Sequence, residues 1–163
     1  MERLVRPVRP KTLRAFRPKY PMDQVLSLID RAGFDQDDID IGTGGFCAMF
    51  ALALYRATID LKPMLVLIVV TRDGKPMRTP KGELFWRHAA VKIGGNYYDI
   101  EGQQQPEWMI ENYVWGIPNC EGKVLEMSPE QFVAEIRTTR NARDWRFYTK
   151  CKALFNQALG RSS

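Results

Sequence analysis

The chain has 163 residues, a net charge of +5, 45% hydrophobic residues and 26% charged residues. This composition is that of an ordinary globular protein and excludes wholesale disorder, and the length predicts one domain. The longest strongly apolar run, residues 64–70, is far shorter than the roughly 20 residues that cross a bilayer. Residues 1–20 are rich in Arg and Pro and lack the apolar centre of a signal peptide. We therefore expect a cytoplasmic protein that makes no contact with a membrane.

Both ends of the chain are basic. Residues 1–20 and residues 137–163 each carry a net charge of +6, which leaves −7 on the residues between them. Such ends either bind nucleic acid or another polyanion, or fold back onto the acidic body. The second interpretation is favoured for the N-terminal segment, because six apolar side chains are available to anchor it to the domain surface: Leu4, Val5, Val8, Leu13, Phe16 and Tyr20.

The predicted elements run in an α+β order. Four prolines disfavour a helix at the start, so residues 1–21 are predicted to form an extended basic arm before a single domain, residues 22–163. Helical periodicity predicts a first helix over 23–34, and a second over 46–55 that is apolar on nearly every face and therefore central and buried. The later elements are a strand at 64–71, a β-hairpin at 84–93 and 97–100, a helix at 106–112, a strand at 124–127, and helices over 128–140 and 144–159.

No metal or organic cofactor is expected. The acidic residues 35–40 are predicted to form a loop, but this loop lacks the Gly and Glu that a calcium loop requires at its later positions. Cys47, Cys120, Cys151 and His88 have the composition of a zinc site, yet no two of them have the close spacing of a ligand pair. The three cysteines are expected to remain reduced thiols.

Cys47 and His88 form a candidate catalytic pair. Cys47 follows three glycines within residues 42–45 and begins the predicted buried helix, where the helix dipole and backbone N–H groups favour a thiolate. His88 is the only histidine of the chain, so any imidazole base must be this residue.

The hairpin supplies a carboxylate next to His88. If Gly94-Gly95 form a two-residue turn, Ile93 pairs with Asn96, and Asp99 becomes a diagonal neighbour of His88 on one face. A three-residue loop would place His88 and Asp99 on opposite faces. The Gly-Gly pair favours the two-residue turn.

The same register leaves a choice of carboxylates. It places Glu101 directly opposite His88, and Trp86 on the face that His88 and Asp99 share. Either Asp99 or Glu101 is then available to orient the imidazole, as a nucleophile–base–orienter triad requires.

Three segments together resemble the papain-like thiol enzymes, in particular their compact bacterial and transglutaminase-like branch. They are GGFCAMFALAL at 44–54, HAAV at 88–91 and YYDIEG at 97–102. The resemblance implies a papain-like fold, with a central buried helix on a small antiparallel sheet and flanking helices. It also implies Cys47 as nucleophile, His88 as base and Asp99, rather than Glu101, as orienter. Gln36 precedes Cys47 as the oxyanion Gln does in many members.

The predicted function is that of a cysteine-dependent hydrolase or acyl-transferase. Its substrate would be an amide bond of a protein or peptide, which makes it a peptidase, isopeptidase, deamidase or amidase. The alternative is a non-catalytic papain-like scaffold that binds a protein or nucleic-acid partner through the basic ends. Nucleic-acid binding has weak support, because no RNP-like or zinc-finger pattern is present. The sequence does not indicate an oligomeric state.

Overall fold

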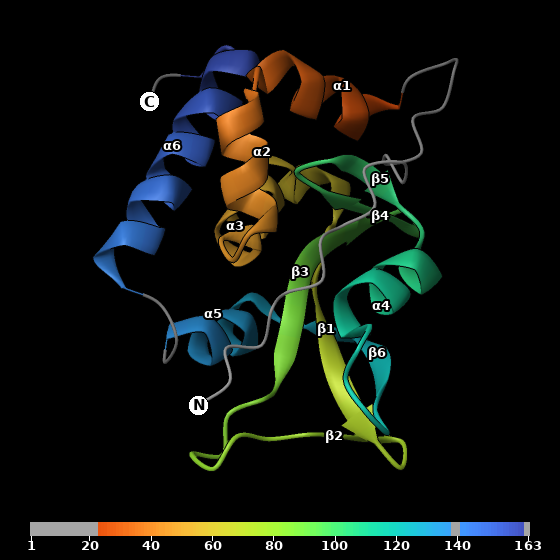
Figure 1. Cartoon of the computed structure of the whole chain (residues 1–163). Helices are drawn as coiled ribbons and strands as arrows, with labels where there is room; N and C mark the ends of the chain where they lie inside the picture. Colours follow the sequence, from red (N-terminus) through yellow and green to blue (C-terminus); the bar gives the residue numbers. More distant parts are fainter. Residues whose placement is uncertain (1–22, 138–140, 162–163) are drawn as a thin grey trace.

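The computed structural model describes residues 23–137 and 141–161 (Figure 1). Over these residues the chain is an α+β fold with six α-helices and an antiparallel sheet, as the sequence predicts. The predicted basic arm, residues 1–21, lies outside the described part of the chain. Its packing against the domain therefore stays a prediction.

The predicted helices and strands are present in the predicted order, with changes at their ends, and α2, β2 and β5 are additional elements. The helices are α1 (Gln24–Ala32), α2 (Gln36–Thr43), α3 (Cys47–Ala57), α4 (Pro106–Val114), α5 (Pro129–Arg137) and α6 (Ala142–Ala158), with a 3₁₀ turn at Ile59–Leu61. The strands are β1 (Met64–Arg72), β2 (Lys75–Pro76), β3 (Trp86–Ile93), β4 (Asn96–Asp99), β5 (Gly102–Gln104) and β6 (Glu121–Met127).

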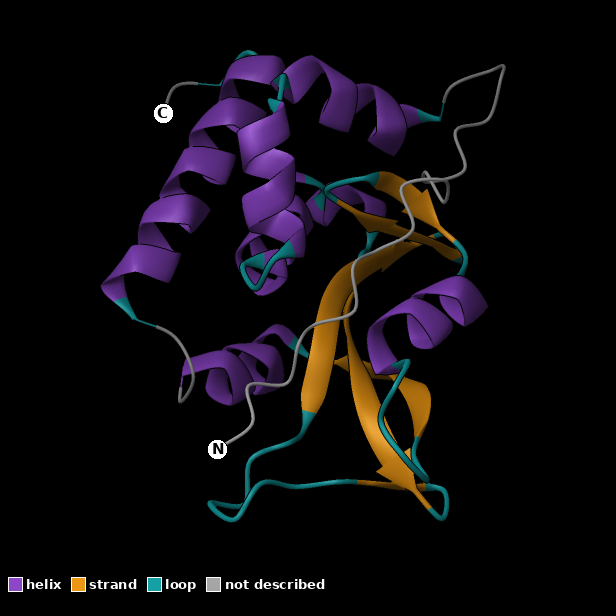
Figure 2. Cartoon of the chain, in the orientation of Figure 1, coloured by secondary structure: helices purple, strands orange, loops and turns teal. Residues whose placement is uncertain are grey.

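Strand β1 is the centre of the sheet (Figure 2). It pairs antiparallel with β3 along one edge and with β6 along the other, and β4 and β5 extend the sheet beyond β3. Its side chains alternate between two apolar clusters, with Leu67 packed on the α3 side and Ile68 on the α4 side. A strand buried on both faces needs apolar residues at every position, which explains the continuous run from 64 to 70.

Helix α3 lies between the sheet and α6 (Figure 1). Every residue from 48 to 54 is at most 2% exposed, so the predicted central, buried helix is confirmed. Phe50 on α3 packs against Phe155 on α6, with ring centroids 5.6 Å apart. Each such buried side chain contributes roughly 1.5–3 kcal/mol relative to an exposed one. The position of α3 is therefore fixed by packing along its whole length.

The acidic segment 35–40 is a helix start, and its prediction as a loop was wrong. Asp35 caps α2 by accepting from the backbone N–H of Asp38, and the Asp38 side chain accepts from the N–H of Asp35. This reciprocal capping box satisfies two backbone donors, and acidic side chains in the first turn favour the helix dipole. The buried carboxylate of Asp38 also pairs with Lys150 on α6. Capping and this ion pair convert an acidic run into a helix.

Strand β6 begins three residues before its predicted start, and the short strands β2 and β5 were not predicted. At Gly122 a Cβ atom would lie 2.6 Å from Ile110 and 2.7 Å from Val114, both on α4. The absence of a side chain lets α4 lie directly on the first part of β6. Strand β6 pairs with β1 from Thr71 to Leu65, and Gly122 is one of the paired residues.

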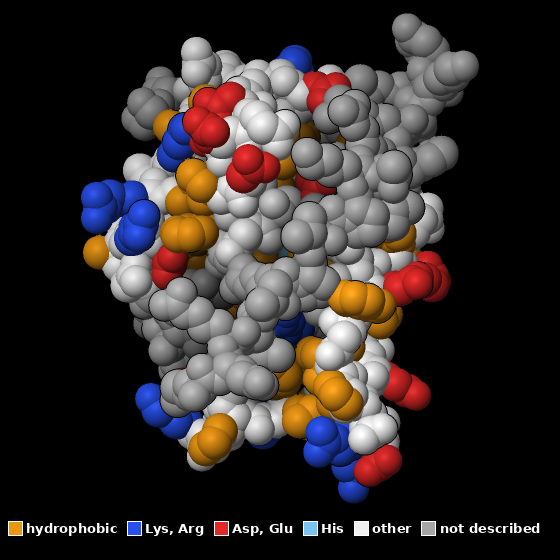
Figure 3. Space-filling view, in the orientation of Figure 1, with side chains coloured by type: hydrophobic (Ala, Val, Ile, Leu, Met, Phe, Trp, Pro, Cys, Tyr) orange, Lys and Arg blue, Asp and Glu red, His pale blue; other side chains and the backbone are white. Residues whose placement is uncertain are grey.

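The surface of the described residues carries both acidic and basic side chains. Figure 3 shows Asp and Glu side chains over α1 and α2 at the top, and Lys and Arg side chains at the edge formed by α6. In residues 23–137 and 141–161 no single helix is long and apolar enough to cross a membrane. Only α2 and α3 taken together reach that length and composition, and a bend of 107° separates them.

Candidate active site

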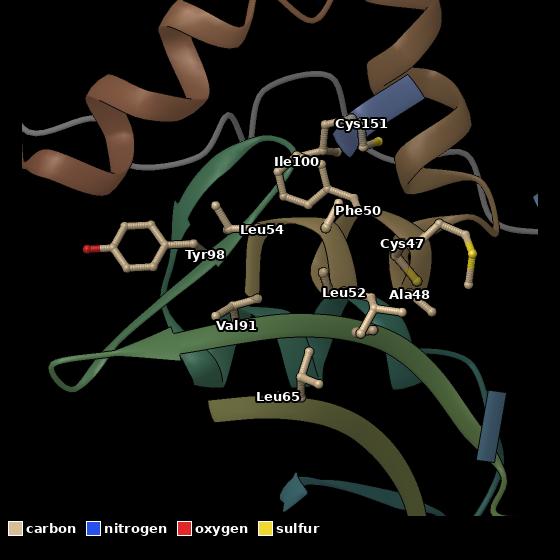
Figure 4. Close-up of a cluster of buried hydrophobic side chains, with 14 of the residues drawn as sticks. Cys47, Ala48, Phe50, Leu52, Leu54, Leu65, Val91, Tyr98, Ile100 and Cys151 are labelled. Atoms are coloured by element: carbon tan, nitrogen blue, oxygen red, sulfur yellow. The ribbon is translucent and has the colours of Figure 1, made fainter. Parts of the chain in front are cut away.

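A glycine-rich turn places Cys47 at the first residue of α3. Gly45 has a φ of +141°, a backbone conformation that favours glycine over residues with a side chain. The turn lets the chain bend by 107° between α2 and α3, and Cys47 then lies in the buried core at 4% exposure. Figure 4 shows Cys47 and Ala48 at the beginning of α3, near Leu52 and above the strand that carries Val91.

The start of α3 has no side-chain cap. Phe46 is the N-cap residue, and it has no polar atom with which to accept a backbone N–H. Its ring instead packs edge-on against Phe147 of α6, with centroids 5.8 Å apart. The thiol of Cys47 therefore lies at a helix start whose positive dipole is not offset by a capping side chain.

Gly42 brings the Cys47 turn against the strand that carries Asp99. A Cβ atom at Gly42 would lie 2.6 Å from Cδ1 of Ile100, the residue that follows Asp99. The end of α2 and the end of β4 can approach this closely only because position 42 has no side chain. This contact joins two parts of the site that are far apart in the sequence.

The β3–β4 hairpin has the register that the sequence predicted. Ile93 pairs with Asn96 across a two-residue turn, in which Gly94 and Gly95 have φ values of +56° and +83°. Positive φ at both central residues is the geometry of a type I′ turn, which matches the twist of the strands. The predicted turn is confirmed, and Asp99 lies at the end of β4.

The predicted position of Glu101 opposite His88 was wrong. The β3–β4 pairing ends at Val91 and Tyr98, and the chain turns back after Asp99, which pairs with Gly102 on β5. Glu101 therefore lies in the turn rather than opposite His88. A hairpin that bends back after four residues cannot extend its ladder to position 101.

A β-bulge separates Trp86 from His88. On β1, Ile68 pairs with His88, but the next residue, Val69, pairs with Trp86. The extra residue, Arg87, shifts the alternation of side chains by one position. Trp86 packs against the cluster on the α3 side, whereas His88 stacks on a ring of α4. The prediction that Trp86 and His88 share a face was wrong for this reason.

Asp99 holds one nitrogen of the His88 ring. Its Oδ2 lies 2.9 Å from Nε2 of His88, and both residues are at most 1% exposed. Its Oδ1 accepts from the backbone N–H of Glu101 at 2.8 Å and from the side-chain amide of Gln104 at 3.0 Å. Of the two candidate carboxylates, the structure brings Asp99 to His88, while Glu101 supports Asp99 through its backbone. Three donors fix the orientation of this carboxylate.

Cys47 interacts with the same imidazole. Complete burial lowers the pKa of His88, but the charge of the Cys47 thiolate and the hydrogen bond to Asp99 outweigh it, and the resulting pKa is about 9. Because Nε2 is bonded to Asp99, the nitrogen that remains for the thiol is Nδ1. Nδ1 is buried and has no completed hydrogen bond within the described part of the chain. The charge of a Cys47 thiolate and the bond to Asp99 therefore both favour the imidazolium form of His88.

The other two cysteines have different surroundings. Cys151 is buried in α6, where burial and then the charge of Asp38 raise the pKa of its thiol to about 12. Cys120 lies beside Met77 at 3.5 Å and Arg72 at 3.7 Å. None of the three forms a disulfide. Cys47 is the cysteine that the structure brings to His88.

Gln36 does not complete an oxyanion site in this structure. It is the first residue of α2, so the whole helix, about 12 Å long by its rise per residue, separates it from the turn that leads to Cys47. Its side-chain amide is exposed and donates to Asp40 at 2.9 Å. The backbone N–H groups at the start of α3 are the donors nearest to Cys47 along the chain.

Sequence reasoning missed Gln104 and Tyr113. Gln104 is buried at 3% exposure and bonds to Asp99, and the turn at 99–102 followed by three glutamines was the signal for a returning strand. Tyr113 lies in α4 and stacks on His88. No spacing in the sequence relates a helix residue at 113 to a strand residue at 88.

Comparisons with protein-family models, with curated proteins and with solved structures found no significant match.

Proposed function

We propose that this protein is a thiol enzyme with Cys47 as nucleophile, His88 as general base and acid, and Asp99 as the residue that orients the imidazole. The observation that carries the proposal is the His88 ring. Its Nε2 lies 2.9 Å from Asp99, and its second nitrogen, Nδ1, is buried. The charge of the Cys47 thiolate raises the pKa of the same ring. A base held on one side and directed to a nucleophile on the other is the arrangement that nucleophilic catalysis requires.

Within this class, we propose a hydrolase or acyl-transferase that acts on an amide bond of a protein or peptide. The order of a helix-start Cys, a strand His and an Asp at the end of the next strand supports membership of the papain-like superfamily. The position of Gln36 departs from that pattern. We place the activity in the cytoplasm, where thiols such as Cys47 remain reduced.

We propose the following reaction for these three groups. The Cys47 thiolate attacks the carbonyl carbon, and the carbon–nitrogen bond breaks as His88 gives its proton to the leaving amine. The acyl group is then held as a thioester on Cys47. Water or an amine attacks this thioester, His88 takes the proton of the attacking group, and the Cys47 thiolate leaves. N–H groups at the start of α3 are the donors that we expect to stabilise the oxyanion.

The first test measures whether Cys47 is a thiolate near neutral pH. The ultraviolet absorbance of thiolate is followed against pH for the wild type and for Cys47→Ala, and the difference gives the titration of Cys47 without requiring a reagent to enter the site. We expect thiolate at about pH 6, well below the ordinary thiol pKa of about 8.5. His88→Gln should raise the pH midpoint of the Cys47 titration. Cys120→Ala is the matched control, in which this midpoint should not change.

The second test identifies the reaction. The protein is incubated with a peptide, an isopeptide and a glutamine-containing peptide, quenched in acid and analysed by mass. A thioester adduct on Cys47, together with hydrolysis, deamidation or amine transfer, would support the proposal and assign its type. An ordinary titration of Cys47 and no adduct would contradict it and would favour the alternative, a scaffold that binds partners through its basic ends.

A further inference from the structure

The imidazole of His88 has an aromatic partner. The rings of His88 and Tyr113 are stacked, with centroids 3.8 Å apart and planes inclined by only 5°. Tyr113 comes from the last turn of α4, and His88 from the middle of the sheet. The half-buried tyrosine ring therefore covers one face of an imidazole that is itself fully buried.

Stacking adds a restraint that the hydrogen bond to Asp99 cannot supply. The bond at Nε2 fixes one point of the ring, but the ring can still tilt about that point and carry Nδ1 away from the thiol. A parallel aromatic ring fixes the plane as well. The ring is also attached to β3 through its Cβ atom, so with that attachment, the bond at Nε2 and the ring plane all fixed, the position of Nδ1 is determined. A base must be held to within a fraction of an ångström for efficient transfer of a proton.

Arg87 links the strand and the helix that carry the two rings. Its Nε donates to the backbone carbonyl of Tyr113 at 3.2 Å. Arg87 is the bulge residue that directly precedes His88, so this irregularity of β3 also ties the strand to the end of α4. This hydrogen bond holds the end of α4 against β3 at the position where the two rings stack.

We propose that Tyr113 is a positioning residue, whose ring holds the imidazole of His88 in the plane that directs Nδ1 to Cys47. This inference rests on the proposed function of Cys47 and His88. The face of an aromatic ring also attracts a cation, so Tyr113 favours the imidazolium over the neutral imidazole.

Proton NMR tests the stack directly, because His88 is the only histidine of the chain and gives one set of imidazole signals. We expect these signals to be shifted upfield by the ring current of Tyr113 in the wild type and in Tyr113→Phe. In Tyr113→Leu the shift should be lost. Signals at the same position in Tyr113→Leu and the wild type would show that the stack does not form in solution, and would overturn the proposal.

The reactivity of Cys47 toward iodoacetamide tests the role of the stack. Tyr113→Leu should lower the rate at about pH 7 by roughly tenfold and move its pH profile upward, since displacement of the base weakens the ion pair. Tyr113→Phe, which keeps the ring, should restore the rate. Trp115→Leu, an exposed aromatic residue at the end of the same helix, is the matched control. A purely structural tyrosine would lower the melting temperature in Tyr113→Leu and leave the pH profile unchanged, and that result would overturn the proposal.

Two further comparisons separate the possible failures. If Tyr113→Leu does not fold, Arg87→Met removes the donor to Tyr113 from an exposed position and should move the profile in the same direction, and an unchanged profile would overturn the proposal. If Cys47 of the wild type titrates as an ordinary thiol, the proposed function fails, and the positioning role fails with it. If only the positioning role fails, Cys47 of the wild type still titrates as a thiolate at low pH, and the Tyr113→Leu and Arg87→Met variants keep the wild-type pH profile.

Discussion

Oδ1 of Asp99 accepts hydrogen bonds from the side-chain amide of Gln104 and from the backbone of Glu101, which leaves Oδ2 directed at Nε2 of His88, 2.9 Å away. The Asp99–Gln104 bond joins β4 to β5, so the short returning strand acts as the support of the carboxylate. The orientation of the histidine therefore depends on a residue that makes no direct bond to it.

Asp99→Asn tests the orienting role. The amide removes the negative charge that helps to raise the pKa of His88, so the thiolate titration of Cys47 should move upward. Turnover should fall but not vanish, because an orienting residue contributes less than the base that it holds.

Glu101→Gln is the matched control for Asp99→Asn, since it preserves the backbone N–H that bonds to Asp99. If Glu101→Gln changes the Cys47 titration as much as Asp99→Asn does, then Glu101 rather than Asp99 is the electrostatic partner of His88.

Gln104→Leu should destabilise the fold and disturb the site together. It leaves one hydrogen bond of a buried carboxylate unmade, which costs about 1–3 kcal/mol. Denaturant unfolding measures this loss, and the alkylation rate of Cys47 should fall in the same variant. Gln103→Leu is the control, because Gln103 bonds to Asn96 at the surface. Equal stability of the two variants would show that the Gln104 bond to Asp99 contributes nothing.

Gly42→Ala should strain the contact between the Cys47 turn and the Asp99 strand. The added Cβ would lie 2.6 Å from Cδ1 of Ile100, and overpacking of this kind costs about 1–3 kcal/mol. Ile100→Val removes Cδ1 and should recover part of the loss in the double variant. Unfolding free energies of the two single variants and the double variant form the test, and strictly additive losses would exclude the contact as the cause.

The titration of His88 should depend on Cys47. In the wild type the pKa of His88 is about 9, above its ordinary value of 6.5, because the thiolate and the bond to Asp99 outweigh the effect of burial. The contribution of His88 to stability is therefore complete below about pH 6.5 and is lost as the pH rises through about 9.

NMR titration of this single histidine provides the measurement. In Cys47→Ala the thiolate charge is absent, so the midpoint should fall, and the loss of stability should begin at lower pH. Cys120→Ala should retain the wild-type midpoint. A midpoint near 6.5 in the wild type would contradict the ion pair.

The sequence alone determined the elements whose causes are local. The two glycines at 94 and 95 determined the turn and register of the hairpin, and the continuous apolar run of residues 46–55 determined a buried central helix. These local patterns were sufficient to select Cys47 and His88 as candidates, with either Asp99 or Glu101 as the orienting carboxylate. The capping box of Asp35 and Asp38, which begins α2, is local as well.

Tertiary structure decided which groups surround the imidazole. The bulge at Arg87 depends on how β3 fits beside β1, and it sends Trp86 and His88 to different neighbours. Tyr113 reaches His88 only because α4 packs on the sheet over Gly122, a contact between segments distant in sequence. No local periodicity encodes such an approach, since it results from how the side chains of two elements fit together after both have formed.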